Sequence, residues 1–295
     1  MKQVEKSILI ISAIWFFTGC RIDFPGLEKH VILSGGVQRT YWLHTPVSKE
    51  ATPLPLVIVL HRFVETGPDM ARITGFNHLA DREAFTVAYP DGRNRSWNGF
   101  GLFATNDTEF LRNVVQDISN KLPIDLSRMY VVGASNGGYM AVRAAMEARD
   151  IFAAAAVVMA TMPASLVEQN PPPLPILFIH GTEDPIVPYD QNTISAGPGM
   201  RFDVLNVPRA VQFWVARNGC HTEPLHEPLP DNDPNDNTLV FRDTYLDDDG
   251  VPCVVLYRVE GGGHTWPGGF EPFPRLLVGR LSRDFSATEA VWELA

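Results

Sequence analysis

The sequence predicts an α/β fold in which a doubly wound, mostly parallel sheet is flanked by helices. Short apolar runs recur along the chain, turn residues follow each run, and segments of helical period separate the runs. Continuous apolar runs of this length are typical of strands that are buried on both faces, as parallel strands are.

Each element follows from a local pattern. Strands are predicted at 56–60, 85–89, 129–132, 152–159, 176–179 and 254–257. Apolar residues at helical spacing predict helices over 110–118, 139–148 and 207–218. Residues 21–50 are expected to form an antiparallel lead-in. The proline-rich segments 170–175 and 228–236 are expected to be an extended connection and a solvated loop, because proline fits neither helix interiors nor central strands.

Composition and charge indicate a folded domain and argue against a nucleic-acid-binding function. The 295-residue chain is 45% hydrophobic, which is enough to bury a sizeable core. It carries 24 Lys and Arg against 34 Asp and Glu, a net charge of −10. Nucleic acid is not an expected partner, since binding to phosphates needs clustered cations and no basic run interleaved with aromatics occurs.

Residues 1–19 are predicted to be a lipoprotein signal peptide. Lys2 and Lys6 precede an apolar run over 8–17 that is too short to span a membrane. The small residues before Cys20 resemble the lipobox of bacterial lipoproteins, in which the lipidated cysteine becomes the new N-terminus. An ordinary signal peptide cut nearby is the alternative.

This interpretation predicts that residues 20–295 form one exported domain, which is attached to the membrane through lipid on Cys20. The expected location is the periplasm or the cell surface of a bacterium. If Cys20 is lipidated, Cys220 and Cys253 remain as an even pair. They are expected to form a disulfide in an oxidising compartment, and two buried free thiols are the alternative.

Residues 133–137 have the pattern Gly-x-Ser-x-Gly between a predicted strand and a predicted helix. In that setting the pattern is typical of a nucleophile elbow, a strained turn that exposes the serine hydroxyl. Ser135 is therefore the candidate nucleophile. The backbone N–H of Asn136 is expected to stabilise the oxyanion, together with an N–H from the loop after strand 56–60, for which Phe63 is the candidate.

A serine hydroxyl needs a base, and the base needs an acid that orients it. In this fold the acid follows the serine along the chain and the histidine follows the acid. Asp184 lies in a turn just past strand 176–179, at the sheet edge where such groups gather. Glu183 and Asp190 are its rivals.

Three histidines follow Asp184 in the chain: His221, His226 and His264. Only His264 comes just past a strong apolar strand, in a loop whose glycines leave room for the ring to reach inward. This predicts His264 as the base, and Trp266 beside it is expected to form a wall for substrate. His61 and His180, which each end a strand at the same edge, are expected to be structural hydrogen-bonding groups.

These motifs together resemble the secreted esterase family that holds polyhydroxybutyrate depolymerases and the related feruloyl and acetyl xylan esterases. The resemblance runs over about nine tenths of the mature chain and rests on the segments 74–85, 89–92, 96–98, 133–138, 180–185, 187–189 and 261–268. It implies an α/β-hydrolase fold without a large lid, a triad of Ser135, Asp184 and His264, a disulfide between Cys220 and Cys253, and no metal or other cofactor.

One position departs from the family pattern, because members usually have His-Gly where this chain has His61-Arg62. Glycine there permits close backbone approach or positive φ, which arginine tolerates poorly. Arg62 is expected to lie near the acyl pocket and to favour anionic substrates, with pairing to Glu65 or Asp69 as the alternative. Trp97, in the motif at 96–98, is expected to join it in contacting substrate.

The leading functional hypothesis is a serine carboxylesterase that forms an acyl-enzyme on polyesters or ester-decorated polysaccharides. A serine peptidase on the same fold would usually carry a larger extra domain. A non-catalytic surface-binding lipoprotein would be expected to lack a triad member, and none is missing here.

Overall fold

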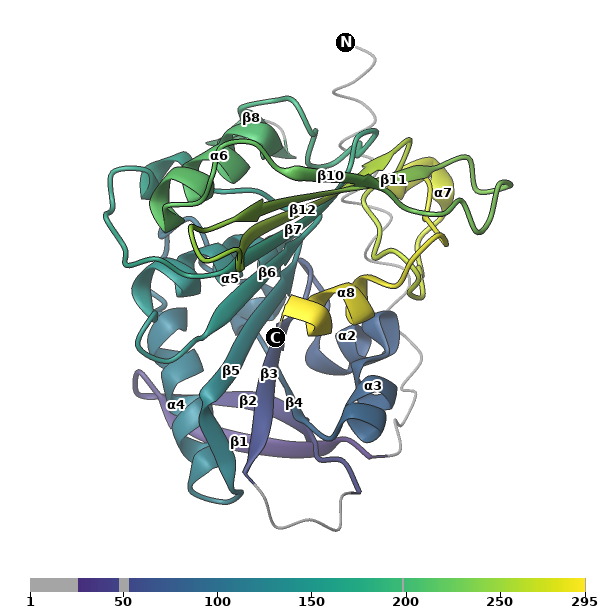
Figure 1. Ribbon diagram of the computed structural model, residues 1–295. Coiled ribbons are helices and arrows are strands. Elements are labelled where there is room, and N and C mark those ends of the chain that lie inside the picture. Colours follow the sequence, from purple (N-terminus) through teal and green to yellow (C-terminus); the bar gives the residue numbers. More distant parts are fainter. Residues whose placement is uncertain (1–25, 48–52, 198, 295) are drawn as a thin grey trace.

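A ten-stranded sheet runs through the molecule in the order β1-β2-β4-β3-β5-β6-β7-β12-β11-β10 (Figure 1). The computed structural model describes residues 26–47, 53–197 and 199–294. The six neighbouring strands from β4 to β12 pair in parallel, and the strands at both edges pair antiparallel. The predicted α/β fold with a mostly parallel sheet is confirmed.

The parallel strands correspond to the six predicted apolar runs: β3 (Leu54–Leu60), β4 (Thr86–Pro90), β5 (Ile124–Ala134), β6 (Ala154–Val158), β7 (Ile176–Gly181) and β12 (Pro252–Glu260). All residues of β4, β6 and β7 are buried. They are apolar throughout because helices cover both faces of the sheet.

The edge strands are more polar and half exposed. β1 (Glu28–Ser34) and β2 (Val37–His44) form the expected antiparallel lead-in. β10 (Leu225–Pro228) and β11 (Leu239–Leu246) extend the other edge, and β8 (Thr193–Gly197) and β9 (Met200–Asp203) form a separate hairpin. These four strands were not predicted, because they lack the continuous apolar runs that marked the central ones.

Helices cover the two faces of the sheet (Figure 1). α4 (Asp107–Ser119), α5 (Asn136–Glu147) and α6 (Val207–Asn218) pack on one face, where they share a core with β3, β5 and β7. α2 (Gly67–Thr74), α3 (Phe76–Glu83) and α8 (Ala287–Leu294) pack on the other. α7 (Arg275–Val278) and the short 3₁₀ turns η2 (Arg93–Arg95) and η3 (Ala164–Leu166) lie in connections.

Three of these helices were predicted, and two of them begin earlier than expected. α4 starts at Asp107, whereas the periodicity indicated residue 110. α5 starts at Asn136, directly after Ser135, whereas the periodicity indicated residue 139. α2 and α3 were missed because each is only eight residues long and a left-handed glycine, Gly75 (φ 69°), separates them.

The order of strands gathers four loops at one edge of the sheet. β3 has β4 on one side and β5 on the other, so the chain changes winding direction there. The carboxyl ends of β3, β5, β7 and β12 lead into the segments that carry Phe63, Ser135, Asp184 and His264.

The predicted signal peptide and Cys20 lie outside the described residues. Within those residues, no helix has the length and apolarity needed to cross a membrane.

Candidate active site

Ser135 occupies a sharp turn between β5 and α5, with φ 52° and ψ −118°. This left-handed conformation is strained for a residue with a Cβ, and such strain clusters at functional sites. The flanking glycines permit the turn. A Cβ on Gly133 would lie 2.0 Å from the carbonyl oxygen of Gly137, and one on Gly137 would lie 2.4 Å from that of Leu60. The geometry is that of a nucleophile elbow.

A continuous hydrogen-bonded chain joins Ser135, His264 and Asp184. His264 Nε2 lies 2.8 Å from Ser135 Oγ, and His264 Nδ1 lies 2.8 Å from Asp184 Oδ2. Asp184 Oδ1 accepts the backbone N–H groups of Ile186 and Val187, each at 2.8 Å. The carboxylate is thus oriented on both oxygens, and it holds the His264 ring with Nε2 toward the serine.

The ionised form of Asp184 is favoured although the residue is buried. Burial alone would raise the pKa of its carboxyl group, but the charge of His264 and hydrogen bonds from His180 and His264 hold that pKa well below its usual range. The rival Glu183 instead forms an ion pair with Arg280. Asp190 is exposed and is not part of this chain of hydrogen bonds.

The glycine-rich loop that carries His264 is closely packed. A Cβ on Gly263 would lie 2.1 Å from the carbonyl oxygen of Val278, and the His264 N–H donates to the same oxygen. The backbone carbonyl oxygen of Arg280 accepts the N–H of Gly263 at 2.8 Å. The glycines therefore let segment 278–280 pack closely against the loop, and this segment holds His264 in place. They also leave room for the histidine ring.

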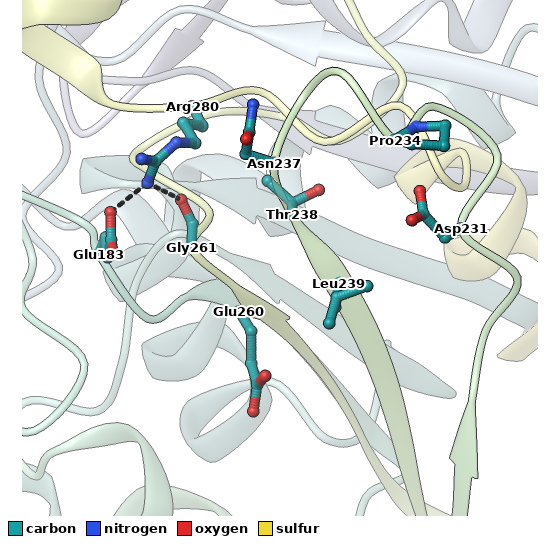
Figure 2. Close-up of a pocket in the computed structure, with 9 residues that line it drawn as sticks. All are labelled: Glu183, Asp231, Pro234, Asn237, Thr238, Leu239, Glu260, Gly261 and Arg280. Atoms are coloured by element: carbon teal, nitrogen blue, oxygen red, sulfur yellow. Dashed lines mark hydrogen bonds and ion pairs between the residues drawn. The ribbon is translucent and has the colours of Figure 1, made fainter.

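A cleft of about 410 Å³ lies beside this loop (Figure 2). Arg280 lies at one side of it, where it pairs with Glu183 and donates to the carbonyl of Gly261 at 3.3 Å. The described residues that line it also include Asp231 and Glu260, so its wall is polar and mixed in charge. Neither Ser135 nor His264 lines it. The cleft therefore flanks the candidate triad without containing it.

Two backbone N–H groups, those of Asn136 and Phe63, are the candidates predicted to receive an oxyanion. Asn136 is the first residue of α5, where helical N–H groups have no partner within the helix. Phe63 lies in the loop after β3, between Arg62 and the strained Val64 (φ 61°). Among the residues that the structure describes, neither N–H donates to a protein acceptor. Their role as the oxyanion hole stays a prediction.

His61 orients the peptide that carries the Phe63 N–H. Its Nε2 accepts the N–H of Gly92 at 2.8 Å, so the proton lies on Nδ1, which donates to the carbonyl of Arg62 at 2.7 Å. Burial lowers the pKa of His61, which favours this neutral form. In a trans peptide the N–H points away from the carbonyl. His61 thus turns the Phe63 N–H away from itself, which fits the expected structural role.

The side chain of Asn136 ties a second loop to the elbow. Its Oδ1 accepts the N–H of Trp97 at 2.7 Å, and its Nδ2 donates to the carbonyl of Trp97 at 3.2 Å. Sequence reasoning assigned only the backbone of Asn136, because this pairing joins residues far apart in the chain.

Both tryptophans that were expected to contact substrate are buried, which corrects those predictions. Trp97 is 2% exposed, donates its indole N–H to the carbonyl of His61, and stacks on Phe110. Trp266 is 1% exposed and donates to Thr288 Oγ1. Large aromatic rings contribute most to stability when they fill the core, and both rings are used in this way.

Arg62 is also buried, which corrects the expectation that its charge is free for an anionic substrate. Its guanidinium pairs with Glu65, at 2.6 Å from Nη2, and with Glu271, at 2.9 Å from Nη1. Burial alone would lower the pKa of Arg62, but the two carboxylates raise it. The alternative of an ion pair with Glu65 is the arrangement observed. Glu271 was missed because it is distant in sequence.

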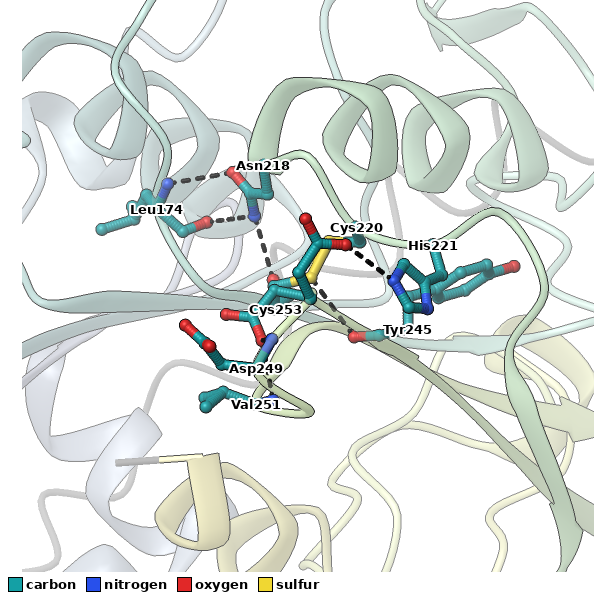
Figure 3. The surroundings of a disulfide bond; sticks show 10 residues. Leu174, Asn218, Cys220, His221, Tyr245, Asp249, Val251 and Cys253 are labelled. Atoms are coloured by element: carbon teal, nitrogen blue, oxygen red, sulfur yellow. Dashed lines mark hydrogen bonds and ion pairs between the residues drawn. A yellow bond between two sulfur atoms is a disulfide. The ribbon is translucent and has the colours of Figure 1, made fainter.

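Cys220 and Cys253 form the expected disulfide, which joins the end of α6 to β12 (Figure 3). The amide of Asn218 beside it donates to the carbonyls of Leu174 and Cys253 and accepts the N–H of Leu174.

His221 and His226 are the two histidines that were not predicted to be the base. They pair with the carboxylates of Asp248 and Asp243 instead.

Known proteins resemble this chain in sequence and in fold. The chain is 30% identical over 282 residues to the putative esterase NocK of Nocardia uniformis subsp. tsuyamanensis, covering 90% of this chain and 81% of NocK. It is 27% identical over 220 residues to feruloyl esterase B of Piromyces equi, spanning 72% of this chain and 39% of that longer protein. The model of the prolyl oligopeptidase family matches residues 85–166. The solved structure of the acetyl xylan esterase from Aspergillus awamori superposes with a TM-score of 0.57 at 16% identity, covering 81% of this chain and 94% of that one, which shows a common fold.

Proposed function

Because the chain belongs to the α/β-hydrolase esterase family that includes NocK, we propose that it is an exported, lipid-anchored serine carboxylesterase that acts through an acyl-enzyme. The observation that carries the catalytic part is the hydrogen-bonded chain from Ser135 Oγ through His264 to Asp184. A hydroxyl at 2.8 Å from an oriented, buried imidazole has the base that it needs to become a nucleophile.

In the proposed mechanism, His264 removes the hydroxyl proton as Ser135 Oγ attacks the ester carbonyl carbon. Negative charge develops on the carbonyl oxygen, and the N–H groups of Asn136 and Phe63 stabilise it. The C–O bond to the alcohol then breaks and His264 gives the proton to the departing oxygen. Water repeats the sequence on the acyl-enzyme, releasing the acid and restoring Ser135.

The proposed substrates are polyesters of hydroxyalkanoates or ester-decorated polysaccharides. Two relatives are named for feruloyl and acetylxylan esters, which supports an acyl group on a polysaccharide. Exposed apolar side chains occur on the loops that follow β3, β4 and His264, namely Phe63, Leu102, Phe103 and Phe270. These residues, rather than the buried tryptophans, are the proposed contacts for the acyl and alcohol parts of the ester.

Substitution of the triad tests the proposal. Ser135→Ala and His264→Ala should each lower kcat by several orders of magnitude while the protein stays folded, and Ser195→Ala, an exposed serine, serves as the matched control. Initial rates on p-nitrophenyl acyl esters, feruloyl esters, acetylated xylan and hydroxybutyrate oligomers would rank the substrates. Retention of more than about a tenth of wild-type turnover by either variant would refute the assignment.

Peptide hydrolysis is the second candidate, because residues 85–166 match the prolyl oligopeptidase family model. That segment contains Ser135 but neither Asp184 nor His264, whereas the match to NocK spans 90% of the chain. Peptide p-nitroanilides in the same panel separate the two activities, and faster turnover of the anilides than of every ester would favour the peptidase.

The proposed anchor is lipid on Cys20, which would supply membrane affinity at about 0.8 kcal/mol per buried CH₂. The support is the Thr18-Gly19-Cys20 sequence after a short apolar run, and the disulfide is consistent with export. Cys20→Ser should release the protein from membranes or block its processing. Mass spectrometry that finds no lipid on the mature N-terminus would refute the anchor.

A further inference from the structure

A second buried imidazole lies beside the Ser135, His264 and Asp184 chain. His180 is the penultimate residue of strand β7, and its side chain is fully buried. Its Nδ1 faces the carbonyl oxygen of Ala160 at 3.2 Å. Its Nε2 faces the carbonyl oxygen of Val187 at 2.8 Å and Asp184 Oδ2 at 3.4 Å.

All three atoms that face the ring nitrogens of His180 are oxygens that can only accept a hydrogen bond. A neutral imidazole carries one N–H, so in the neutral state one ring nitrogen would direct its lone pair at an oxygen. Protonation of both nitrogens removes that repulsion and gives each nitrogen an acceptor. The contrast with His61 is informative, since the Nε2 of His61 faces a backbone N–H.

We propose that His180 is held as an imidazolium and is a positioning residue that shares the Asp184 carboxylate with His264, so that it fixes the carboxylate that orients the base. The part that concerns catalysis rests on the proposed function, because it takes His264 as the base. The protonation of His180 itself does not depend on that assignment.

The charged and titratable groups around His180 support a cation at this position. Burial alone would lower the pKa of His180, but the hydrogen bond and charge of Asp184, together with the two carbonyls, raise it above its ordinary value. Tyr139 from α5 and Tyr189 from the following loop stay neutral, because burial raises the pKa of both phenols. Arg258, opposite in β12, is paired with Glu260.

Sharing of one carboxylate has a consequence for His264. Asp184 Oδ2 contacts both imidazoles, so the position of that oxygen depends on His180 as well as on His264. The hydrogen bond and the charge of His180 both help to keep Asp184 ionised. His180 therefore helps to fix the carboxylate that orients the His264 ring toward Ser135.

The decisive variant is His180→Gln, which keeps a hydrogen-bonding side chain and removes the cation. Its kcat on a p-nitrophenyl ester should fall by roughly tenfold or more while KM changes little, because the orientation of His264 is disturbed and no group that contacts substrate is removed. His221→Gln is the matched control, because it removes an exposed imidazole that pairs with Asp248 at 2.9 Å. A kcat that stays at the wild-type value in His180→Gln, or a loss that appears only in KM, would overturn the proposal.

A second measurement needs no active variant. Nitrogen-detected NMR of the histidine rings in the wild-type protein should show both ring N–H groups on His180 at about pH 7. A neutral His180 at that pH would overturn the proposal even if His180→Gln failed to fold. If Ser135→Ala retained full activity, the proposed function would fail, but the ring spectrum of His180 would still decide its charge.

Discussion

Replacement of Arg62 by glycine should lower the free energy of unfolding by about 3–5 kcal/mol, the usual cost of removing one partner from a buried ion pair. The guanidinium makes four hydrogen bonds to Glu65 and Glu271, and the three side chains are 5%, 8% and 8% exposed. Removal of the cation leaves two carboxylates buried without a counter-charge. Its packing against the Phe273 ring, at 5.1 Å, is lost as well.

Urea denaturation followed by tryptophan fluorescence would measure this loss. The triple variant Arg62→Met/Glu65→Gln/Glu271→Gln should recover most of the stability, because it removes the carboxylate charges together with the cation. Arg112→Met, which breaks a pair with Asp150 at the surface, should have a much smaller effect.

Substrate selectivity also tests whether the role of Arg62 is structural. The ratio of kcat/KM for neutral and anionic esters should be the same in Arg62→Gly and wild type, since the charge of Arg62 is already used within the protein. A fall in activity confined to anionic esters, with unchanged stability, would show that Arg62 contacts substrate and would refute the structural role.

Three further predictions follow from the structure. Gly137→Ala should abolish activity or folding, since its Cβ would lie 2.4 Å from the carbonyl oxygen of Leu60, and a fully active variant would contradict the packing of the elbow. Joint replacement of Cys220 and Cys253 by serine should lower the free energy of unfolding by about 3–4 kcal/mol in the chain-entropy model, and an unchanged thermal midpoint would argue against a stabilising bond. The raised pKa of His180 means that its protonation stabilises the fold fully below its ordinary value of 6.5, and that this contribution is lost as the pH rises through the folded-state pKa. The stability advantage of wild type over His180→Gln should therefore shrink above that pH, and an advantage that grows with pH would have the wrong sign.

The sequence by itself determined the central sheet and the order of the candidate catalytic groups. Apolar runs identify the six parallel strands because burial on both faces demands continuous hydrophobicity. The candidates Ser135, Asp184 and His264 follow three of these strands, and parallel strands end at one edge, so their proximity could be predicted without coordinates. The edge strands and the short helices α2 and α3 were missed, because half-exposed elements carry weaker patterns.

Only the tertiary structure decided where the polar and aromatic side chains near the site point. Arg62 is paired with Glu271, which is 209 residues away along the chain, and no local pattern encodes that contact. Trp266 lies beside His264 in sequence, yet its ring points into the core against Phe76. A side chain's surroundings are set by which distant segments pack against it, and this is why the motifs predicted the candidate triad but misassigned its neighbours.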